Sequence, residues 1–261
     1  MSDILCLFAH QDDEYGLASR IAYEVRAGNR IYCVYLTDGQ AKGSSSRVRD
    51  SESLQVLTSL GVSPDFVYFY GSTKGVRDGR LLYHLDETAS GVAHWVMANG
   101  LNITRLFCTA WEGGHADHDA CHLVALNLAK LWDILSDTWQ FPFYNGYKTP
   151  WKTFRVLSPL SQTSNTNRRL TLRDGLRYAV LCSKYRSQRR TWLGLFPEAF
   201  FRRCILRQEI VQPVSLDAIR NRPHEGPLLY EKLFGFHSSE FMKVSGAFRS
   251  RLHTSSKLSS L

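Results

Sequence analysis

Short apolar runs alternate with longer amphipathic segments through the first half of the chain. The apolar runs have the length of buried strands, and they are Ile4–Ala9, Arg30–Leu36, Asp65–Tyr70 and Thr104–Trp111. The segments between them have apolar positions at helical spacing, and they are Glu14–Ala27, Arg47–Leu60, Asp86–Asn99 and Asp117–Leu135. Gly28, Gly61 and Gly100 follow three of these helices, where helices commonly end. This alternation predicts a parallel sheet with helices on both faces.

We therefore predict a three-layer α/β/α, Rossmann-like fold with a mostly parallel sheet and a C-terminal cap region. In the doubly wound order 3-2-1-4-5, the first and fourth strands are neighbours where the winding reverses, and ligands bind beyond their carboxyl ends. Polar clusters follow both strands, because His10–Glu14 comes after the first and Gly113–His118 after the fourth. The expected topology would bring these two distant segments into one crevice.

The alternation fades in the second half of the chain. Thr138–Trp151 is rich in aromatic residues, which suit either stacking on sugar rings or packing on a sheet. Ser158–Arg169 is polar and reads as a loop, while Leu172–Trp192 has the pattern of one helix or two short ones. The serine-rich Thr254–Ser260 is expected to fray.

Length and composition favour one globular domain. The chain has 261 residues, of which 44% are hydrophobic and 21% charged. We expect residues 1–137 to form the Rossmann-like catalytic half and residues 138–261 to complete and cap the site.

Charge is divided unevenly along the chain. Residues 1–150 contain 12 Lys and Arg against 17 Asp and Glu, whereas residues 151–261 contain 20 against 7. Such a split suits an anionic partner or simply a solvated basic surface. Ser183–Gln208 interleaves basic and aromatic residues, a pattern found on anionic membrane surfaces, around phosphate-bearing substrates, or over a buried aromatic core. No helix-turn-helix, RNP or zinc-finger pattern favours nucleic acid.

Cysteine usage and the N-terminus indicate the compartment. The six cysteines lack paired spacing, and Cys6, Cys33 and Cys108 fall inside predicted strands, as reduced core residues do. There is no signal-peptide pattern, and no apolar run approaches the roughly 20 residues of a membrane span. We expect a cytoplasmic protein, with peripheral contact at the inner face of the membrane as an option.

The two polar clusters have the residue types of a hydrolytic metal site. Such a site needs about three imidazole or carboxylate ligands, an open position for water and a nearby unbound base. His10, Asp13 and His118 form a His-Asp-His ligand set. The adjacent Asp12 could then take a proton from the attacking water, and His115 could protonate the leaving nitrogen or stabilise the oxyanion.

Other interpretations exist for each cluster. Acidic residues are favoured in the first turn of any helix, so the segment after the first strand could be an ordinary helix start. His118 and His122, four apart on a predicted helix, are a rival ligand pair, although we assign His122 to packing or support of the site. Two histidines and one carboxylate also suit Fe²⁺ oxygenase chemistry, but an oxygenase needs no adjacent base such as Asp12.

The segment Ala9-His10-Gln11-Asp12-Asp13-Glu14, with the later Gly-Gly-His-Ala-Asp-His ending at His118, resembles the PIG-L/LmbE-like family of zinc-dependent N-acetylglucosaminyl de-N-acetylases. The resemblance covers roughly residues 3–135. It implies that His10, Asp13 and His118 bind Zn²⁺, that Asp12 is the general base, and that His115 stabilises the tetrahedral intermediate.

The resemblance extends to weaker matches. Asp38, in the turn after the second strand, and Arg49, on the next helix, correspond to substrate-binding positions. Asp117 and Glu14 would support the residues that bind metal or substrate. Arg49 and Glu52 match an Arg-x-x-Glu pair of the family, although on their own they are most simply an ion pair at i, i+3.

Smaller matches and two departures complete the comparison. Asp78-Gly79 is similar to a turn of the family, and Ser187-Gln188 to a pair late in many members. Gln11 and Ala116 replace the two prolines of the family motifs. Neither proline supplies a ligand, so metal binding should persist while the shape of both turns changes.

These observations predict a metal-dependent hydrolase that removes the N-acetyl group from an N-acetylglucosamine-type glycoconjugate. Zn²⁺ is the expected cofactor, with Fe²⁺ as an option, and the substrate is expected to be anionic or lipid-linked. The alternative is a non-catalytic protein that binds sugar or nucleic acid and retains the fold.

Overall fold

The computed structural model describes residues 1–40, 45–150, 153–161 and 166–254. The central sheet has seven strands in the order β3-β2-β1-β4-β5-β9-β8. Its strands are β1 (Asp3–Phe8), β2 (Arg30–Tyr35), β3 (Val67–Phe69), β4 (Ile103–Thr109), β5 (Thr138–Phe141), β8 (Thr166–Arg169) and β9 (Gln208–Pro213). The first five pair in parallel, and β9 and β8 add an antiparallel edge. The predicted strand order 3-2-1-4-5 is confirmed, and β1 and β4 are neighbours.

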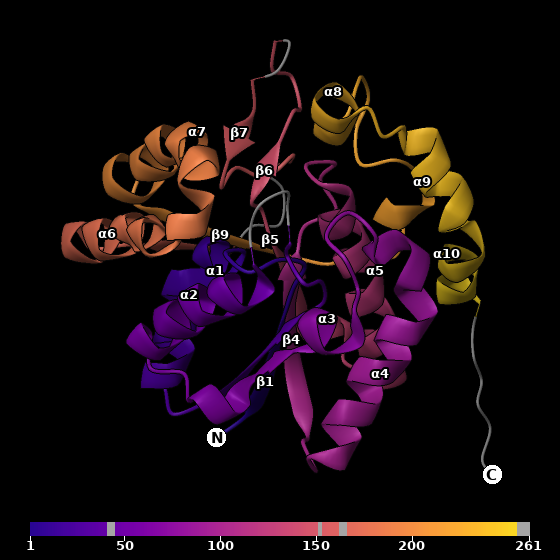
Figure 1. The fold of residues 1–261 in the computed structure, drawn as a ribbon, viewed down its shortest axis with the longest axis horizontal. Helices are drawn as coiled ribbons and strands as arrows, with labels where there is room; N and C mark the ends of the chain where they lie inside the picture. Colours follow the sequence, from indigo (N-terminus) through magenta and orange to yellow (C-terminus); the bar gives the residue numbers. More distant parts are fainter. Residues whose placement is uncertain (41–44, 151–152, 162–165, 255–261) are drawn as a thin grey trace.

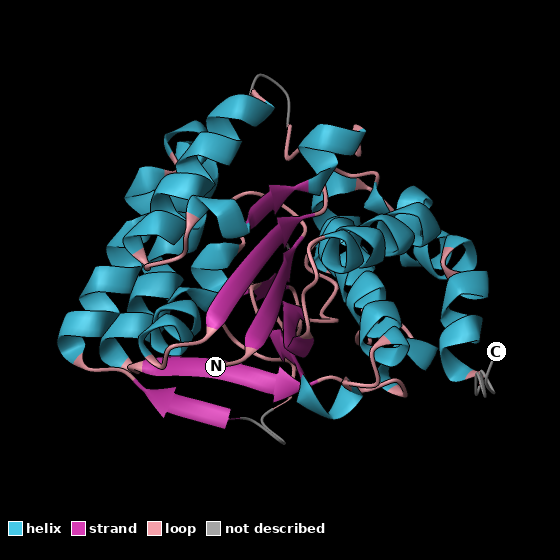
Figure 2. Ribbon diagram, turned by 90° about the horizontal axis from the view of Figure 1, so that it is seen from below, coloured by secondary structure: helices cyan, strands magenta, loops and turns pink. Residues whose placement is uncertain are grey.

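Ten helices are present in the described part of the chain, and they form two layers around the sheet (Figure 1, Figure 2). They are α1 (Glu14–Arg26), α2 (Ser46–Ser59), α3 (Tyr70–Lys74), α4 (Leu85–Ala98), α5 (Ala116–Leu131), α6 (Leu172–Ala179), α7 (Arg189–Phe200), α8 (Leu229–Phe234), α9 (Ser238–Val244) and α10 (Gly246–His253). The predicted helices of the first half are confirmed, and their ends shift by only a few residues. The predicted three-layer fold with a mostly parallel sheet is therefore correct.

Alternate residues of each buried strand supply the two halves of the core. In β1, Leu5 and Leu7 join a cluster with α4, α5, α9 and α10, while Ile4 and Cys6 face α1 and α2. The second cluster also receives residues from α6, α7 and β9. Because both faces of the strand are buried, its sequence is continuously apolar.

The second half of the chain contributes to both the sheet and its covering layers. A short hairpin of β6 (Tyr144–Asn145) and β7 (Arg155–Val156) extends beyond β5 (Figure 1). Leu172–Trp192 forms two helices, because α6 ends at Ala179 and α7 begins at Arg189. Trp151 and the tail beyond Thr254 lie outside the described residues.

Two predicted segments differ from the structure. The polar stretch up to Arg169 ends in a strand, β8, which pairs with β9. Its polar sequence fits an edge strand, since an edge needs no apolar faces on both sides and is protected by charge. The predicted strand at Asp65–Tyr70 is shorter, because Pro64–Phe66 form a 3₁₀ turn before β3 and Tyr70 starts α3.

Candidate metal centre

The candidate site lies where β1 and β4 end side by side. Leu7 of β1 is in register with Cys108 of β4, so the segments that follow leave the sheet together. One segment continues into α1 and the other into α5. The topology predicted from the strand pattern thus brings the two polar clusters together at the carboxyl edge of the sheet.

The turn after β1 holds its acidic residues by hydrogen bonds within the turn. The Asp13 carboxylate accepts the His10 backbone N–H at 2.8 Å, and the Glu14 carboxylate accepts the Asp12 N–H at 3.0 Å. Asp12 has φ 112°, a backbone conformation that residues with a side chain rarely adopt. Such strain costs about 1–3 kcal/mol and is concentrated at functional sites, so the fold aims the Asp12 side chain at a cost in stability.

The turn before α5 depends on two glycines. Gly113 has φ 69°, and a Cβ on Gly114 would lie 1.9 Å from the Tyr144 carbonyl oxygen. His115 then caps α5, because its Nδ1 accepts the Asp117 backbone N–H at 3.1 Å. The absence of side chains at these two positions thus lets the turn pack closely against β6.

The predicted ligand residues are brought together. The candidate donor atoms of His10, Asp13 and His118 all lie within 4.8 Å of one another, and the three residues are buried. His118 Nε2 is 3.0 Å from Asp13 Oδ1, and His10 Nδ1 is 3.9 Å from Asp13 Oδ2. Two imidazoles and one carboxylate at this spacing suit Zn²⁺, with the rest of the coordination sphere left open.

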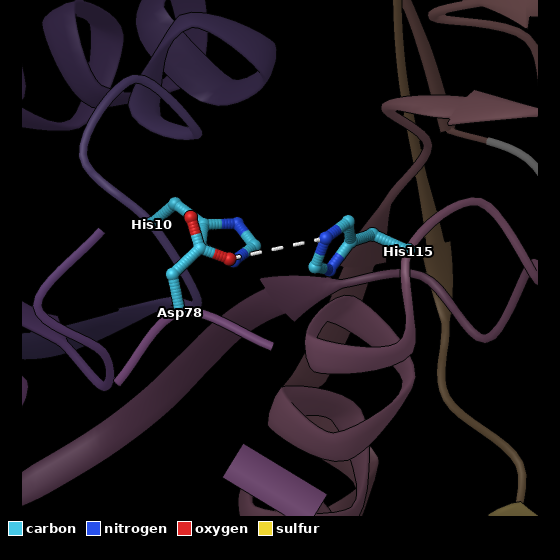
Figure 3. Close-up of side chains that lie close together, drawn as sticks. All are labelled: His10, Asp78 and His115. Atoms are coloured by element: carbon cyan, nitrogen blue, oxygen red, sulfur yellow. Dashed lines mark ion pairs between the residues drawn. The ribbon is translucent and has the colours of Figure 1, made fainter. Parts of the chain in front are cut away.

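A second candidate set shares His10 and lies at the mouth of the site. It consists of His10, Asp78 and His115 (Figure 3). Asp78 Oδ1 lies 3.2 Å from His10 Nε2 and 3.9 Å from His115 Nε2. The first set uses His118 as a ligand, and the second uses His115. Which ring nitrogen carries the proton in each of these histidines therefore decides which set can bind a metal ion.

The hydrogen bonds favour the buried set. His115 Nδ1 already accepts a backbone N–H, so in the neutral ring the proton sits on Nε2, which then has no lone pair for a metal. Among the described residues no group bonds the buried His118 Nδ1, so the ring proton can sit there. His118 Nε2, 3.0 Å from Asp13 Oδ1, would then direct its lone pair to an ion shared with that carboxylate. The residues of the buried set therefore fit a metal ion, and those of the outer set do not.

Asp117 orients the shared histidine. Its carboxylate lies 3.1 Å from His10 Nε2 and accepts the backbone N–H groups of Gly79 and Leu81 at 2.6 and 3.1 Å. In the neutral His10 ring the proton thus belongs on Nε2, and the Nδ1 lone pair faces Asp13. Carboxylates commonly orient metal-binding histidines in this way, and the supporting role of Asp117 stays a prediction.

Burial and neighbouring charges shift the pKa values of the acidic residues. Burial raises the pKa of Asp12 to about 6, against the opposing charge of Arg49, whose Nη2 lies 3.0 Å from Asp12 Oδ1. Despite its burial, Asp13 keeps a pKa lowered to about 2 by His118. Burial raises the pKa of Glu14 to about 7. Glu14 is fully buried and does not line the pocket, whereas Asp12 does, so Asp12 is the member of this pair placed to exchange a proton with a bound molecule.

The two outer histidines differ in charge. Burial and the neighbouring His10 lower the pKa of His115 to about 4, so its ring is neutral and presents an Nε2–H donor. Burial alone would lower the pKa of His10, but Asp78 and Asp117 raise it well above its ordinary value. Because metal ligation needs a neutral His10, a metal ion and a proton would compete for this ring.

Some predicted residues have a different setting from the one expected. Asp38 accepts the backbone N–H groups of Gln40 and Asp78 at 2.9 and 3.0 Å, and its substrate role stays a prediction. The simple Arg49–Glu52 ion pair is wrong: Glu52 instead accepts the Ser187 N–H and O–H at 2.9 and 2.6 Å.

His122 lies apart from both candidate metal sets. Its Nδ1 is 3.0 Å from the Thr109 carbonyl oxygen, and burial lowers its pKa to about 4. This placement agrees with the packing role assigned to it.

Gln11 replaces a family proline without leaving its turn free. Its amide donates to Asp50 Oδ1 at 2.6 Å and to the Thr37 carbonyl at 3.3 Å. The Arg49 guanidinium also donates to the Gln11 carbonyl. The side chain thus ties the turn to α2, where a proline would have restrained only its own φ.

The pocket contains residues that sequence reasoning did not assign to it. Its volume is about 870 Å³, and Asp78, Tyr144, Tyr230 and Phe234 line it together with His10, Asp12 and Arg49. Asp78 follows α3, and its sequence indicated only a turn. Tyr230 and Phe234 come from α8, far along the chain from any motif. A buried carboxylate, Glu112, accepts backbone N–H groups of Phe143 and Tyr144 at 2.7 and 2.9 Å and so positions this wall. No sequence signal identified it.

Comparison with known proteins connects the site to a family. Residues 5–129 match the PIG-L family model, described as GlcNAc-PI de-N-acetylase. No curated protein matches the chain in its sequence. Its fold resembles the zinc-inhibited form of a teicoplanin deacetylase, at 14% identity and a TM-score of 0.62, over 82% of this chain and 98% of that one.

Other solved structures extend the likeness. N,N'-diacetylchitobiose deacetylase from Pyrococcus horikoshii is 16% identical, with a TM-score of 0.54, over 81% of this chain and 84% of that one. A 4-carboxy-2-hydroxymuconate hydratase from Pseudomonas putida is 13% identical, with a TM-score of 0.54, over 87% of this chain and 100% of that one. Likeness at these identities shows a shared fold, and the reaction has to be argued from the site.

Proposed function

We propose that the chain, whose residues 5–129 match the PIG-L family model, is a metal-dependent hydrolase that deacetylates an N-acetyl-amino sugar. The observation that carries the proposal is the buried set of His10, Asp13 and His118 beside Asp12, a carboxylate outside that set. A binding protein would have no need for a strained, partly desolvated carboxylate next to three metal donors. The deacetylases among the similar structures support the same reaction class.

His10, Asp13 and His118 would hold the ion, and we propose Zn²⁺, with Fe²⁺ as the alternative. When bound, the ion would polarise the amide carbonyl and lower the pKa of a water molecule. Asp12 would take the proton of the attacking water, since burial brings its pKa to about 6. It would then pass this proton to the leaving nitrogen, which yields acetate and a free amine.

His115 would stabilise the oxyanion and not protonate the leaving group. Its ring is neutral, with a pKa of about 4, and its Nδ1 accepts a backbone N–H. The Nε2–H is therefore the group it offers to the pocket, where it can donate to the amide oxygen as negative charge develops. Asp78, 3.9 Å from this nitrogen, would hold the ring in position.

Metal content and acetate release test the proposal. Elemental mass spectrometry of the purified protein, before and after incubation with Zn²⁺, should find about one ion per chain. The Asp13→Ala variant should lose it, while Asp65→Ala, at an exposed aspartate, should keep it. Acetate should then appear from at least one N-acetylglucosamine conjugate in a panel. An absence of bound metal after Zn²⁺ is supplied would refute the mechanism.

A further inference from the structure

A second cleft, of about 540 Å³, lies beside the candidate metal centre. Its walls are α2 and the chain that leads from α6 to α7. Their polar residues in the lining are Arg47, Ser51, Glu52, Gln55, Ser183, Lys184 and Arg186. Neither the metal set nor the residues assigned to catalysis include any of them.

The cleft has an excess of uncommitted positive charge. Arg47, Lys184 and Arg186 are exposed, and none of them forms an ion pair in the part of the chain that the structure describes. The one carboxylate in the lining, Glu52, is occupied by the backbone N–H and the hydroxyl of Ser187 at 2.9 and 2.6 Å. The Ser183 hydroxyl donates to the Val180 carbonyl at 2.7 Å. Three cations and the hydroxyl of Ser51 thus remain available to an anion.

The cleft and the candidate active site share a wall. Helix α2 presents Arg49 to the active-site pocket and Arg47 to the cleft. The turn Arg186–Gln188 does the same, with Gln188 in the pocket and Arg186 in the cleft. Glu52 of α2, which lines the cleft, is hydrogen-bonded to Ser187 and so ties this turn to the helix. A substrate whose sugar occupies the pocket can therefore extend over this wall.

We propose that the cleft binds a phosphate or diphosphate group carried by the aglycone of the amino sugar. The proposal rests on the proposed function, because it names the class of substrate for that site. Arginine and lysine recognise phosphate oxygens through charge-assisted hydrogen bonds, and serine hydroxyls donate to the same oxygens. Either a nucleoside diphosphate or a lipid diphosphate supplies this chemistry.

Direct binding tests the cleft without any catalytic step. Inorganic pyrophosphate is titrated calorimetrically into protein dialysed free of metal. The double variant Lys184→Gln/Arg186→Gln should bind it at least tenfold more weakly than the unaltered protein. The control Arg26→Gln/Lys243→Gln removes the same charge at two exposed residues outside the cleft lining. Its affinity for pyrophosphate should stay within twofold of that of the unaltered protein. No binding by the unaltered protein, or equal weakening in both variants, would overturn the proposal.

Kinetics separate this inference from the proposed function. Acetate release is compared for an N-acetylglucosamine nucleoside diphosphate, a lipid diphosphate of the same sugar and an uncharged glycoside. At least one diphosphate should have the higher kcat/KM, and Lys184→Gln/Arg186→Gln should cut that preference at least tenfold. If the uncharged glycoside is hydrolysed as well as both diphosphates, the cleft assignment is wrong and the hydrolase stands. If no sugar is hydrolysed but variant-sensitive pyrophosphate binding persists, the hydrolase fails and the anion site stands.

Discussion

At the scale of single residues, the neighbours of Asp12 define its task. Its backbone N–H is bound by Glu14 and its carboxylate by Arg49, so both the position and the ionisation of the side chain are controlled. Arg49 also donates to the carbonyl oxygens of Gly39 and Gln11. These bonds hold the strained turn together. Arg49 therefore shapes the site even without a contact to the substrate.

Asp12→Asn should retain metal and lose activity. The amide keeps the shape and a hydrogen-bond acceptor for Arg49 but cannot take a proton, so kcat should fall by about 10²–10⁴-fold. Metal content should match that of the unaltered protein, and Asp65→Asn serves as a control of equal charge change. Full activity of Asp12→Asn would show that another group is the base.

His122 should make folding stability depend on pH. Its pKa is lowered to about 4 in the folded protein, whereas an unfolded histidine titrates near 6.5. The unfolded chain therefore binds the proton first, and stability is lost as pH falls through this window. The contribution amounts to about 2 kcal/mol between pH 7 and pH 5.

Denaturant unfolding of His122→Gln across this pH range measures the effect. Gln keeps a donor for the Thr109 carbonyl but does not titrate, so the free energy of unfolding of the variant should fall less between pH 7 and pH 5 than that of the unaltered protein. If the free energies of unfolding of the two proteins changed with pH in parallel, the low pKa assigned to His122 would be contradicted.

At the scale of elements, α6 exposes an apolar stripe. Leu172, Leu176 and Val180, at helical spacing along α6 and just beyond it, are 54%, 43% and 53% exposed. Exposed Arg173 and Arg177 stand beside them. The adjoining π-helical turn Phe201–Ile205 adds Phe201 and Ile205, at 47% and 60% exposure. Among the helices of the described residues, none has the length and apolar character of a membrane span.

We predict that this stripe binds anionic lipid. Apolar side chains flanked by arginine suit the interface of a negatively charged bilayer. The protein should sediment with vesicles that contain phosphatidylglycerol and not with pure phosphatidylcholine. Leu176→Asp/Val180→Asp should abolish sedimentation, whereas Met97→Asp/Leu131→Asp, at exposed positions on α4 and α5, should not. Equal sedimentation of all variants would rule out this surface.

At the scale of the whole molecule, the two halves of the chain share one core. Tyr178, Trp192 and Val211 belong to the same buried cluster as Ile4 and Ile21. Across the sheet edge, Glu209 of β9 binds Arg20 and Ser19 of α1 at 2.9 and 2.8 Å. The later half thus completes the core of the earlier one.

A chain cut after residue 137 should therefore fail to fold. It would lack β5, β9 and the helices that cover α1, and it would expose most of one core cluster to water. Near-ultraviolet circular dichroism should show no fixed aromatic packing, while the full chain should unfold in one cooperative transition. A folded 1–137 fragment would show that the family-matched segment is an independent domain.

The alternation of apolar runs and amphipathic segments determined the order of elements in the first half, since buried parallel strands need continuous apolar sequence and helices need one apolar face. It also determined which edge of the sheet receives His10, Asp13 and His118, because parallel strands end at a common edge. The motifs supplied Asp12 and His115. The edge strand β8 was hidden because an edge tolerates polar residues, so its sequence resembles a loop.

Only the tertiary structure decided what surrounds these residues. Asp78, Glu112 and Phe234 reach the site from segments whose paths depend on long-range packing, and no local pattern records such contacts. The choice between His115 and His118 as a metal ligand depends instead on a local contact, in which the Asp117 backbone N–H donates to the His115 ring at the start of α5. Residue type and spacing determined the candidate chemistry, and hydrogen bonds formed in the folded chain assigned each residue its part in it.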